Sequence, residues 1–263
     1  MVRRARLDAE LVRRGLARSR EQAAELVHAG RVRVGGSTAT KPATAVDPAT
    51  PVLVEAHPDQ PDYVSRGGHK LAGALDALPT LRVGGRRALD AGASTGGFTD
   101  VLLRRGAREV VAVDVGYGQL AWSLRTDPRV TVHDRSNVRE LTPAAIGGPA
   151  ELTVADLSFI PLTLVLPALV ACTAPDGDLL PMVKPQFEVG RERVGAGGVV
   201  RDPALRAEAV LKVAAAAYEL GLGTEAVVRS PLPGPAGNVE FFLWLRHRGP
   251  AADPDAVAAA VAP

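Results

Sequence analysis

The sequence has little cysteine and no long apolar run, and each shortage excludes a class of protein. The single cysteine, Cys172, excludes a disulfide framework and any metal site built from several cysteines, so we expect no metal. The longest apolar stretch, residues 162–172, contains Pro167 and is too short to cross a bilayer, which predicts a core helix. The first residues lack the apolar core of a secretion signal. We therefore expect a cytoplasmic protein with no membrane partner.

Lysine is scarce as well, and the charge is unevenly distributed. The chain has 27 Arg and four Lys, a bias that a GC-rich genome would explain. Residues 1–46 hold ten Arg and Lys against four Asp and Glu, a net charge of +6, whereas residues 47–263 have a net charge of −4. This asymmetry predicts a basic module that binds a polyanion, attached to a near-neutral body.

Two domains fit the length of 263 residues and the pattern along the chain. The first sixty residues predict a small α/β unit, with a capping box at Ser19 and Gln22 that begins a helix over 20–28. Five prolines between 42 and 61 follow it. We place the first domain at 1–60, a linker at about 56–64, a second domain at 65–250 and a flexible tail at 251–263.

The second domain alternates apolar strands with helices, which predicts an α/β fold with a doubly wound, mostly parallel sheet. The last strand follows a proline-rich loop suited to a tight return, so we expect that it can run antiparallel. Helices are expected over 69–78, 97–105, 161–171 and 203–220. Seven strands are expected, over residues 87–91, 110–115, 130–132, 152–155, 178–183, 225–228 and 239–245.

A glycine-rich loop over residues 89–98 follows the first of these strands and begins a helix. It lacks the second glycine of the dinucleotide fingerprint, and Asp90 before its first glycine would repel a phosphate. The loop therefore suits a cationic or zwitterionic ligand such as the methionine part of S-adenosylmethionine. Asp114 ends the next strand, where a carboxylate can hold two ribose hydroxyls. The alternative is a tight turn that binds no ligand.

Four charged residues are expected at the ends of strands or the start of a helix beside this loop. Ligands bind at this edge of open α/β sheets. Each charge alone is explained by a structural ion pair, but two lysines and two carboxylates around one pocket would neutralise one another. Crowded amines also have a lowered pKa, which favours a general base. We call these four residues the tetrad: Lys70, Asp156, Lys184 and Glu240.

These residues match a known family. The tetrad and the glycine-rich loop resemble the Lys-Asp-Lys-Glu set of the FtsJ-like ribose 2'-O-methyltransferases. The pattern from Arg6-Leu7-Asp8 to Gly30-Arg31-Val32 resembles an S4-type RNA-binding domain. The combination, over about residues 3–247, is similar to the TlyA family of rRNA (cytidine-2'-O)-methyltransferases, once labelled haemolysins.

The resemblance implies a Rossmann-like class I fold that uses S-adenosylmethionine to methylate cytidine ribose in 16S rRNA, 23S rRNA or both. Lys184 would act as the general base or orient the hydroxyl, with Lys70 and Glu240 tuning it, and Asp156 would lie between cofactor and lysines. Asp114 would bind the ribose, and Asp134 would lie near the adenine unless its loop is an ordinary solvated turn. The residues expected at the methionine end are Gly92, Ser94, Gly96, Gly97 and Phe98.

The basic residues of the first domain are expected to contact phosphates and to give salt-dependent affinity. The alternative is a solvated arginine-rich face. Aromatic residues make up only 4%, which favours shape readout of a folded rRNA helix over extensive base stacking. The sequence also leaves two other functions open: a non-catalytic ribosome assembly factor and a haemolysin-like membrane-acting protein. The arginines are Arg3, Arg4, Arg6, Arg13, Arg14, Arg18 and Arg20.

Overall fold

The chain divides into two compact units, Met1–Asp62 and Tyr63–Pro263, here called the N-terminal and C-terminal units. The computed structural model describes residues 4–17, 19–55 and 62–262. Most of the linker expected at about 56–64 lies outside these residues, because 56–61 are not described.

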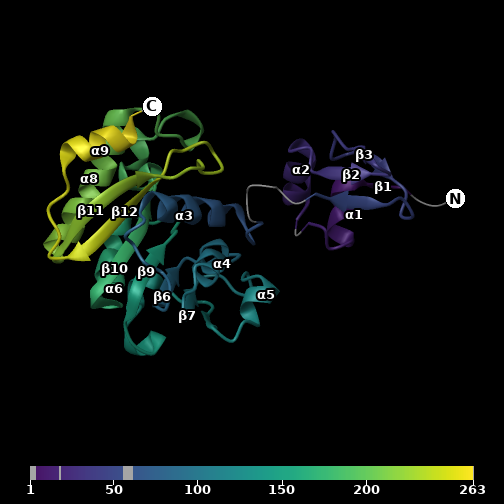
Figure 1. Ribbon diagram of the computed structural model, residues 1–263. Coiled ribbons are helices and arrows are strands. Elements are labelled where there is room, and N and C mark those ends of the chain that lie inside the picture. The colour runs from purple at the N-terminus through teal and green to yellow at the C-terminus, as the bar shows by residue number, and fades with distance from the viewer. Residues whose placement is uncertain (1–3, 18, 56–61, 263) are drawn as a thin grey trace. The chain divides into compact units, whose positions relative to one another are not determined.

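The N-terminal unit packs two helices against short strands (Figure 1). Ser19 accepts a hydrogen bond from the Gln22 backbone N–H at 3.1 Å, so the second helix begins where the capping box predicted it. Leu7, Leu11 and Leu26 are buried between the elements. The elements are β1 (Ala5–Arg6), α1 (Leu7–Arg13), α2 (Arg20–His28), β2 (Val32–Val34), β3 (Ser37–Thr38), β4 (Ala45–Val46) and β5 (Val52–Val54).

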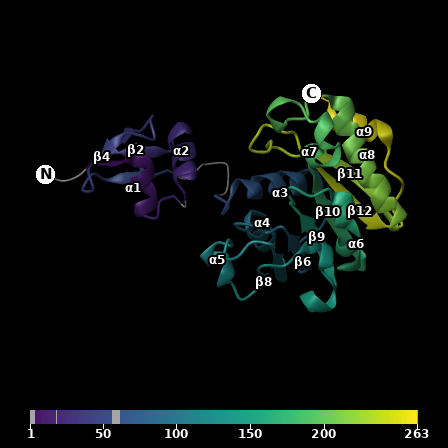
Figure 2. The same ribbon diagram turned by 180° about the vertical axis from the view of Figure 1, so that it is seen from behind.

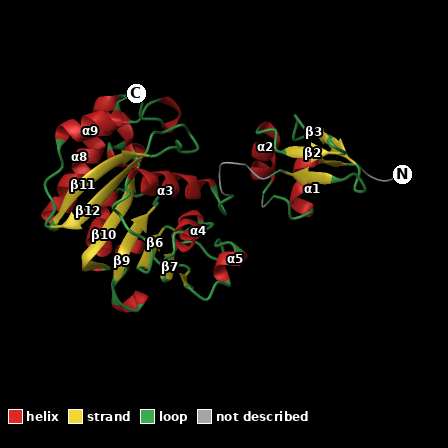
Figure 3. Ribbon diagram, in the orientation of Figure 1, coloured by secondary structure: helices red, strands yellow, loops and turns green. Residues whose placement is uncertain are grey.

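Seven strands form one sheet in the described part of the C-terminal unit, in the order β11-β12-β10-β9-β6-β7-β8 (Figure 3). All neighbours from β10 to β8 are parallel, and β12 is antiparallel to both β10 and β11. The mostly parallel sheet and its antiparallel last strand are therefore confirmed. The strands are β6 (Arg87–Ala91), β7 (Glu109–Val113), β8 (Val130–His133), β9 (Ala150–Ala155), β10 (Thr173–Val183), β11 (Leu222–Arg229) and β12 (Phe241–His247).

Helices cover both faces of this sheet (Figures 1 and 2). The principal helices are α3 (Arg66–Ala77), α4 (Gly97–Arg104), α5 (Trp122–Arg125), α6 (Leu166–Ala171), α7 (Pro185–Glu188), α8 (Pro203–Glu219) and α9 (Pro254–Val261). Short 3₁₀ turns are η1 (Val138–Glu140), η2 (Ala144–Ile146), η3 (Leu162–Leu164), η4 (Arg191–Arg193) and η5 (Ala196–Gly198).

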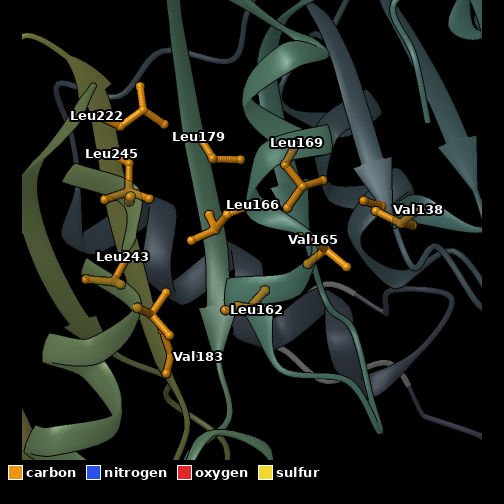
Figure 4. Packing of buried hydrophobic residues seen from close by; sticks show 14 of the residues in the cluster. Val138, Leu162, Val165, Leu166, Leu169, Leu179, Val183, Leu222, Leu243 and Leu245 are labelled. Carbon is orange, nitrogen blue, oxygen red and sulfur yellow. The ribbon is translucent and has the colours of Figure 1, made fainter. Parts of the chain in front are cut away.

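Alternation along the strands sends apolar side chains to two cores. On β6, Leu89 belongs to the core beneath α6, α8 and α9, whereas Ala88 belongs to the core beneath α3 and α4. Figure 4 shows the first core, where Leu166 of α6 lies near Leu179 of β10 and Leu243 of β12. The two cores pack the sheet between helical layers, and the strand order then sets where its strand ends lie.

Two predicted segments differ from the structure. The helix expected over 161–171 is divided into η3 and α6, because Pro167 lacks an N–H and occupies the first turn of a new helix. The tail was predicted to be frayed or a loose helix; in the structure it forms α9, which buries Val257 and Val261 and packs against α8 and β11. The Thr224 N–H of β11 also donates to the Pro250 carbonyl at 2.7 Å. The segment covers part of an edge strand, which sequence composition does not reveal.

None of the helices in the described residues is both long and apolar enough to cross a membrane.

Candidate active site

The tetrad comes together at the carboxyl edge of the sheet. Asp156 directly follows β9 and Lys184 directly follows β10. Glu240 directly precedes β12, and the antiparallel register that pairs Val183 with Phe241 brings it to the same edge. Lys70 lies in the first half of α3. The four residues come from separate parts of the chain, and the strand order unites them.

The tetrad forms two ion pairs. The Nζ atom of Lys184 lies 2.6 Å from Oδ1 of Asp156, and the Nζ atom of Lys70 lies 2.5 Å from Oε2 of Glu240. Lys70, Lys184 and Glu240 are buried, whereas the Asp156 side chain is about a quarter exposed. Buried lysines need such partners, because an uncompensated charge in the interior is strongly destabilising.

A fifth polar side chain joins the Lys184 pair. The Lys184 Nζ donates to Oγ of Ser158 at 2.9 Å, and Ser158 lies two residues after Asp156 in the same loop. The sequence prediction did not include Ser158 in the site. Its position just beyond the end of a buried strand, near a candidate catalytic carboxylate, was the signal available.

A cavity of about 290 Å³ joins the tetrad to the glycine-rich loop. All four members of the tetrad line it, together with four of the residues expected at the methionine end. The lining also contains Ser65, Arg66, Thr95 and Pro235, which the prediction did not include. The cavity is lined by Ser65, Arg66, Gly67, Lys70, Gly92, Ala93, Ser94, Thr95, Gly97, Phe98, Asp156, Ser158, Lys184, Pro235 and Glu240.

The glycines of the loop are required by protein contacts as well as by any ligand. A Cβ on Gly92 would lie 2.6 Å from the Asp156 carbonyl oxygen, and a Cβ on Gly97 would lie 2.2 Å from the Ser65 Oγ. Gly96, which has a φ of +96°, faces Leu124. The absence of side chains therefore lets the loop pack tightly against the segments that carry Asp156 and α3.

Asp90 lies in β6 at the start of the glycine-rich loop and is fully buried. Its Oδ2 accepts a 2.6 Å hydrogen bond from the Thr99 hydroxyl, and its Oδ1 has no hydrogen-bond partner among the described residues. Burial, with a smaller contribution from the negative charge of Asp156, raises the pKa of Asp90 to about 7. A nearby cation would favour the ionised form of this carboxyl group.

Four predicted cofactor residues lie outside the lining of this cavity as described: Asp90, Gly96, Asp114 and Asp134. Asp114 accepts the backbone N–H of Ser94 at 2.8 Å and that of Gly116 at 2.6 Å, so it connects the glycine-rich loop to the loop after β7. Asp134 forms a 2.9 Å ion pair with Arg125, which holds its pKa below the usual range.

The arginines of the N-terminal unit divide into two kinds. Arg4, Arg6, Arg13 and Arg20 are exposed. Arg14 is only 19% exposed and donates to the carbonyls of Thr50 and Pro48, each at 2.8 Å. Arg3 and Arg18 lie outside the described residues.

Comparisons with known proteins cover both units. The sequence matches the FtsJ-like methyltransferase family over residues 63–247 and the S4 domain over residues 5–52. It is 65% identical to the 16S/23S rRNA (cytidine-2'-O)-methyltransferase TlyA of Mycobacterium tuberculosis, over 94% of this chain and 91% of that protein. It is 33% identical to Hemolysin A of Brachyspira hyodysenteriae, over 90% of this chain and 98% of that protein. A solved structure of a candidate hemolysin from Streptococcus thermophilus superposes with a TM-score of 0.77 at 38% identity, covering 99% of this chain and 95% of that one.

Proposed function

The chain belongs to the TlyA family of FtsJ-like methyltransferases, and from this premise we propose that it methylates the 2'-hydroxyl of cytidine in ribosomal RNA. The observation that carries the proposal is the cavity that joins the glycine-rich loop to two lysine–carboxylate pairs. One end of this cavity suits a cationic methyl donor, and the other offers an amine to a hydroxyl group.

The residues around the glycine-rich loop fit S-adenosylmethionine. Oδ1 of the buried Asp90, which has no hydrogen-bond partner within the described part of the chain, favours a cationic ligand, and a ligand with a sulfonium and an ammonium group meets that requirement. When bound, this cofactor supplies an electrophilic methyl group. Asp114 and Asp134 are proposed to extend the site toward the ribose and the adenine. The methionine end is assigned to Gly92, Ser94, Gly96, Gly97 and Phe98.

Lys184 is proposed to accept the proton of the target hydroxyl. The Nζ atom of Lys184 lies 2.6 Å from Oδ1 of Asp156 and donates to Oγ of Ser158 at 2.9 Å, so these two side chains hold it in place. Lys184 also lines the cavity, where the lone pair of its deprotonated amine would be available to a target hydroxyl. When the hydroxyl is methylated, its proton would pass to Nζ of Lys184.

The second pair, Lys70 and Glu240, is proposed to set the charge around Lys184 without taking the proton. The charges of Lys70 and Glu240 neutralise each other, so the buried Lys70 does not destabilise the fold. Alignment of hydroxyl and methyl group in one cavity supplies much of the rate by proximity.

Ribosomal RNA is proposed as the partner because the N-terminal unit matches the S4 domain and exposes several arginines. Modification of both 16S and 23S rRNA is proposed from the name of the 65% identical relative, a 16S/23S rRNA methyltransferase. A cytoplasmic location is proposed with it, since the substrate is part of the ribosome.

Mass-spectrometric mapping of methylated nucleotides tests the proposal, using rRNA from cells with and without this protein. We expect 2'-O-methylcytidine only where the protein is present, and its loss in cells that carry Lys184→Ala. Isothermal titration of the purified Lys184→Ala variant with S-adenosylmethionine should give near wild-type affinity. Identical methylation in all three strains would refute the proposal.

The hemolysin names of two relatives favour a second candidate, a membrane-acting protein. Leakage of dye from liposomes on addition of the purified protein would support this candidate. A non-catalytic assembly factor is a third possibility, and absence of S-adenosylmethionine binding in the titration would favour it.

A further inference from the structure

A buried carboxylate lies between two exposed arginines of the N-terminal unit. The Asp8 side chain, in the first turn of α1, is only 6% exposed. Its Oδ2 accepts from Nη2 of Arg6 at 2.8 Å and from Nη2 of Arg20 at 3.1 Å, and its Oδ1 accepts from Nε of Arg6 at 3.1 Å. Arg6 belongs to β1 and Arg20 begins α2, so Asp8 connects two separate elements.

This contact brings two like charges together. Both guanidinium groups donate to the same carboxylate oxygen, so they are close neighbours that would repel each other without Asp8. The bonds from Arg6 hold the pKa of Asp8 well below its usual range, so the carboxylate stays ionised at any neutral assay pH. The negative charge of Asp8 is therefore present throughout the assay range.

Both arginines still face solvent. Their side chains are 54% and 60% exposed, and each guanidinium has five N–H donors, of which the bonds to Asp8 use two from Arg6 and one from Arg20. The remaining donors suit a phosphate, which guanidinium groups bind with paired hydrogen bonds. Holding the arginines in place before binding reduces the side-chain entropy that binding would otherwise lose.

We propose that Asp8 is a positioning residue that holds Arg6 and Arg20 together as one grip for a backbone phosphate of RNA. This inference rests on the proposed function, because it takes ribosomal RNA as the ligand. It reverses the simplest electrostatic expectation, in which an acidic residue on a basic face only weakens binding of a polyanion.

The test compares two substitutions that remove the same charge. Asp8→Asn is isosteric and removes the carboxylate that holds the arginines, whereas Glu21→Gln removes an exposed carboxylate in the first turn of α2. Affinity of the full chain for in vitro transcribed 23S and 16S rRNA is measured by filter binding without cofactor. We expect Asp8→Asn to weaken binding about tenfold. Glu21→Gln should leave it unchanged or raise it by up to about twofold.

Salt dependence and a double-mutant cycle separate positioning from unfolding. Loss of one phosphate contact should lower the magnitude of the slope of log affinity against log salt by about 0.7–0.9. In an Arg6→Ala/Arg20→Ala background, Asp8→Asn should no longer weaken binding, because the residues it positions are gone. Thermal unfolding of each variant is recorded in parallel.

The outcomes distinguish this inference from the proposed function. If the wild-type chain does not bind rRNA, the RNA-binding part of the proposed function fails. If the wild type binds and Asp8→Asn binds as tightly or more tightly, the positioning role is overturned. A tenfold loss that persists in the double-arginine background overturns it as well, since Asp8 would then act through the fold alone.

Discussion

Both units of this molecule pair carboxylates that are buried or mostly buried with cations, but the cations differ. In the N-terminal unit, Asp8 binds the guanidinium groups of Arg6 and Arg20, which are more than half exposed. In the C-terminal unit, Glu240 and Asp156 bind the amines of Lys70 and Lys184, which lie against a cavity and are less than a tenth exposed.

The difference teaches which task each cation can perform. An arginine is always charged and presents a planar fork that matches a phosphate, whereas a lysine can lose its proton when its environment favours the neutral form. The chain has only four lysines among 31 basic residues, and two of them are in the tetrad. The type of cation at each site therefore agrees with RNA binding in one unit and proton transfer in the other.

The largest effect is expected when the type of cation is exchanged at each site. Lys184→Arg keeps the positive charge but removes the amine, so we expect turnover to fall by about 10²–10⁴-fold in a single-turnover methyl-transfer assay. The reciprocal Arg20→Lys keeps a charge near the phosphate and should weaken rRNA affinity only about fivefold or less.

Cofactor titration and thermal unfolding serve as controls for Lys184→Arg, because a guanidinium group is larger than an amine. Near-normal cofactor affinity with lost turnover would support the role in proton transfer. Turnover within tenfold of wild type would contradict it, because a guanidinium group cannot accept the proton.

The sequence predicted the strands and the tetrad that build the site, but not every side chain that contacts the tetrad. Alternating and continuous apolar runs predicted the seven strands, and the rule that ligands bind at carboxyl edges then grouped Lys70, Asp156, Lys184 and Glu240. Ser158 was missed because a single hydroxyl has no spacing pattern, and its position after a buried strand gains meaning only with the 2.9 Å contact to Lys184.

Other details depend on tertiary contacts that composition does not show. The C-terminal segment looks like a loose Ala/Pro tail, yet Val257 and Val261 lie one helical turn apart and pack against α8 and β11. Arg13 and Arg14 are neighbouring residues of the same type, yet they differ in exposure. Arg14 is the less exposed, because its guanidinium group donates to the carbonyls of Thr50 and Pro48.

The free energy of unfolding should depend on pH in opposite directions in the two units. Through Asp90 it should decrease in the C-terminal unit as pH rises, and through Glu10 it should decrease in the N-terminal unit as pH falls. The pKa of Asp90 is raised to about 7 by burial, so its stabilising contribution is complete below about 3.8 and is lost as pH rises through about 7. The pKa of Glu10 is lowered to about 2 by hydrogen bonds from Arg13 and Arg14. Its contribution is complete above about 4.5 and is lost as pH falls through about 2.

Asp90→Asn tests the first of these signs. The wild-type C-terminal unit should lose up to about 4 kcal/mol of unfolding free energy between pH 4 and pH 8 through this group, and the variant should lack that part. Both tryptophans, Trp122 and Trp244, lie in the C-terminal unit, so urea unfolding followed by their fluorescence reports on it selectively. Parallel curves for wild type and variant across this range would show that Asp90 is ionised in the fold throughout.

The smallest effect distinguishes two neighbouring arginines of the N-terminal unit. Arg14 is 19% exposed and donates to Glu10 and to the carbonyls of Thr50 and Pro48, whereas Arg13 is 62% exposed and contacts Glu10. Arg14→Ala leaves two carbonyls without their donor and should destabilise this unit by about 1–2 kcal/mol. Arg13→Ala should change its stability by less than about 0.5 kcal/mol.

Amide hydrogen exchange of the full chain, read on peptides from α1 and α2, measures both changes. Binding to rRNA should show the reverse order, because the exposed Arg13 can reach a phosphate while Arg14 is turned toward Thr50 and Pro48. After correction for any unfolded fraction, Arg13→Ala should therefore weaken rRNA binding more than Arg14→Ala does. Equal protection in the two variants, or a larger loss of affinity in Arg14→Ala, would mean that exposure does not separate RNA-binding arginines from structural ones in this unit.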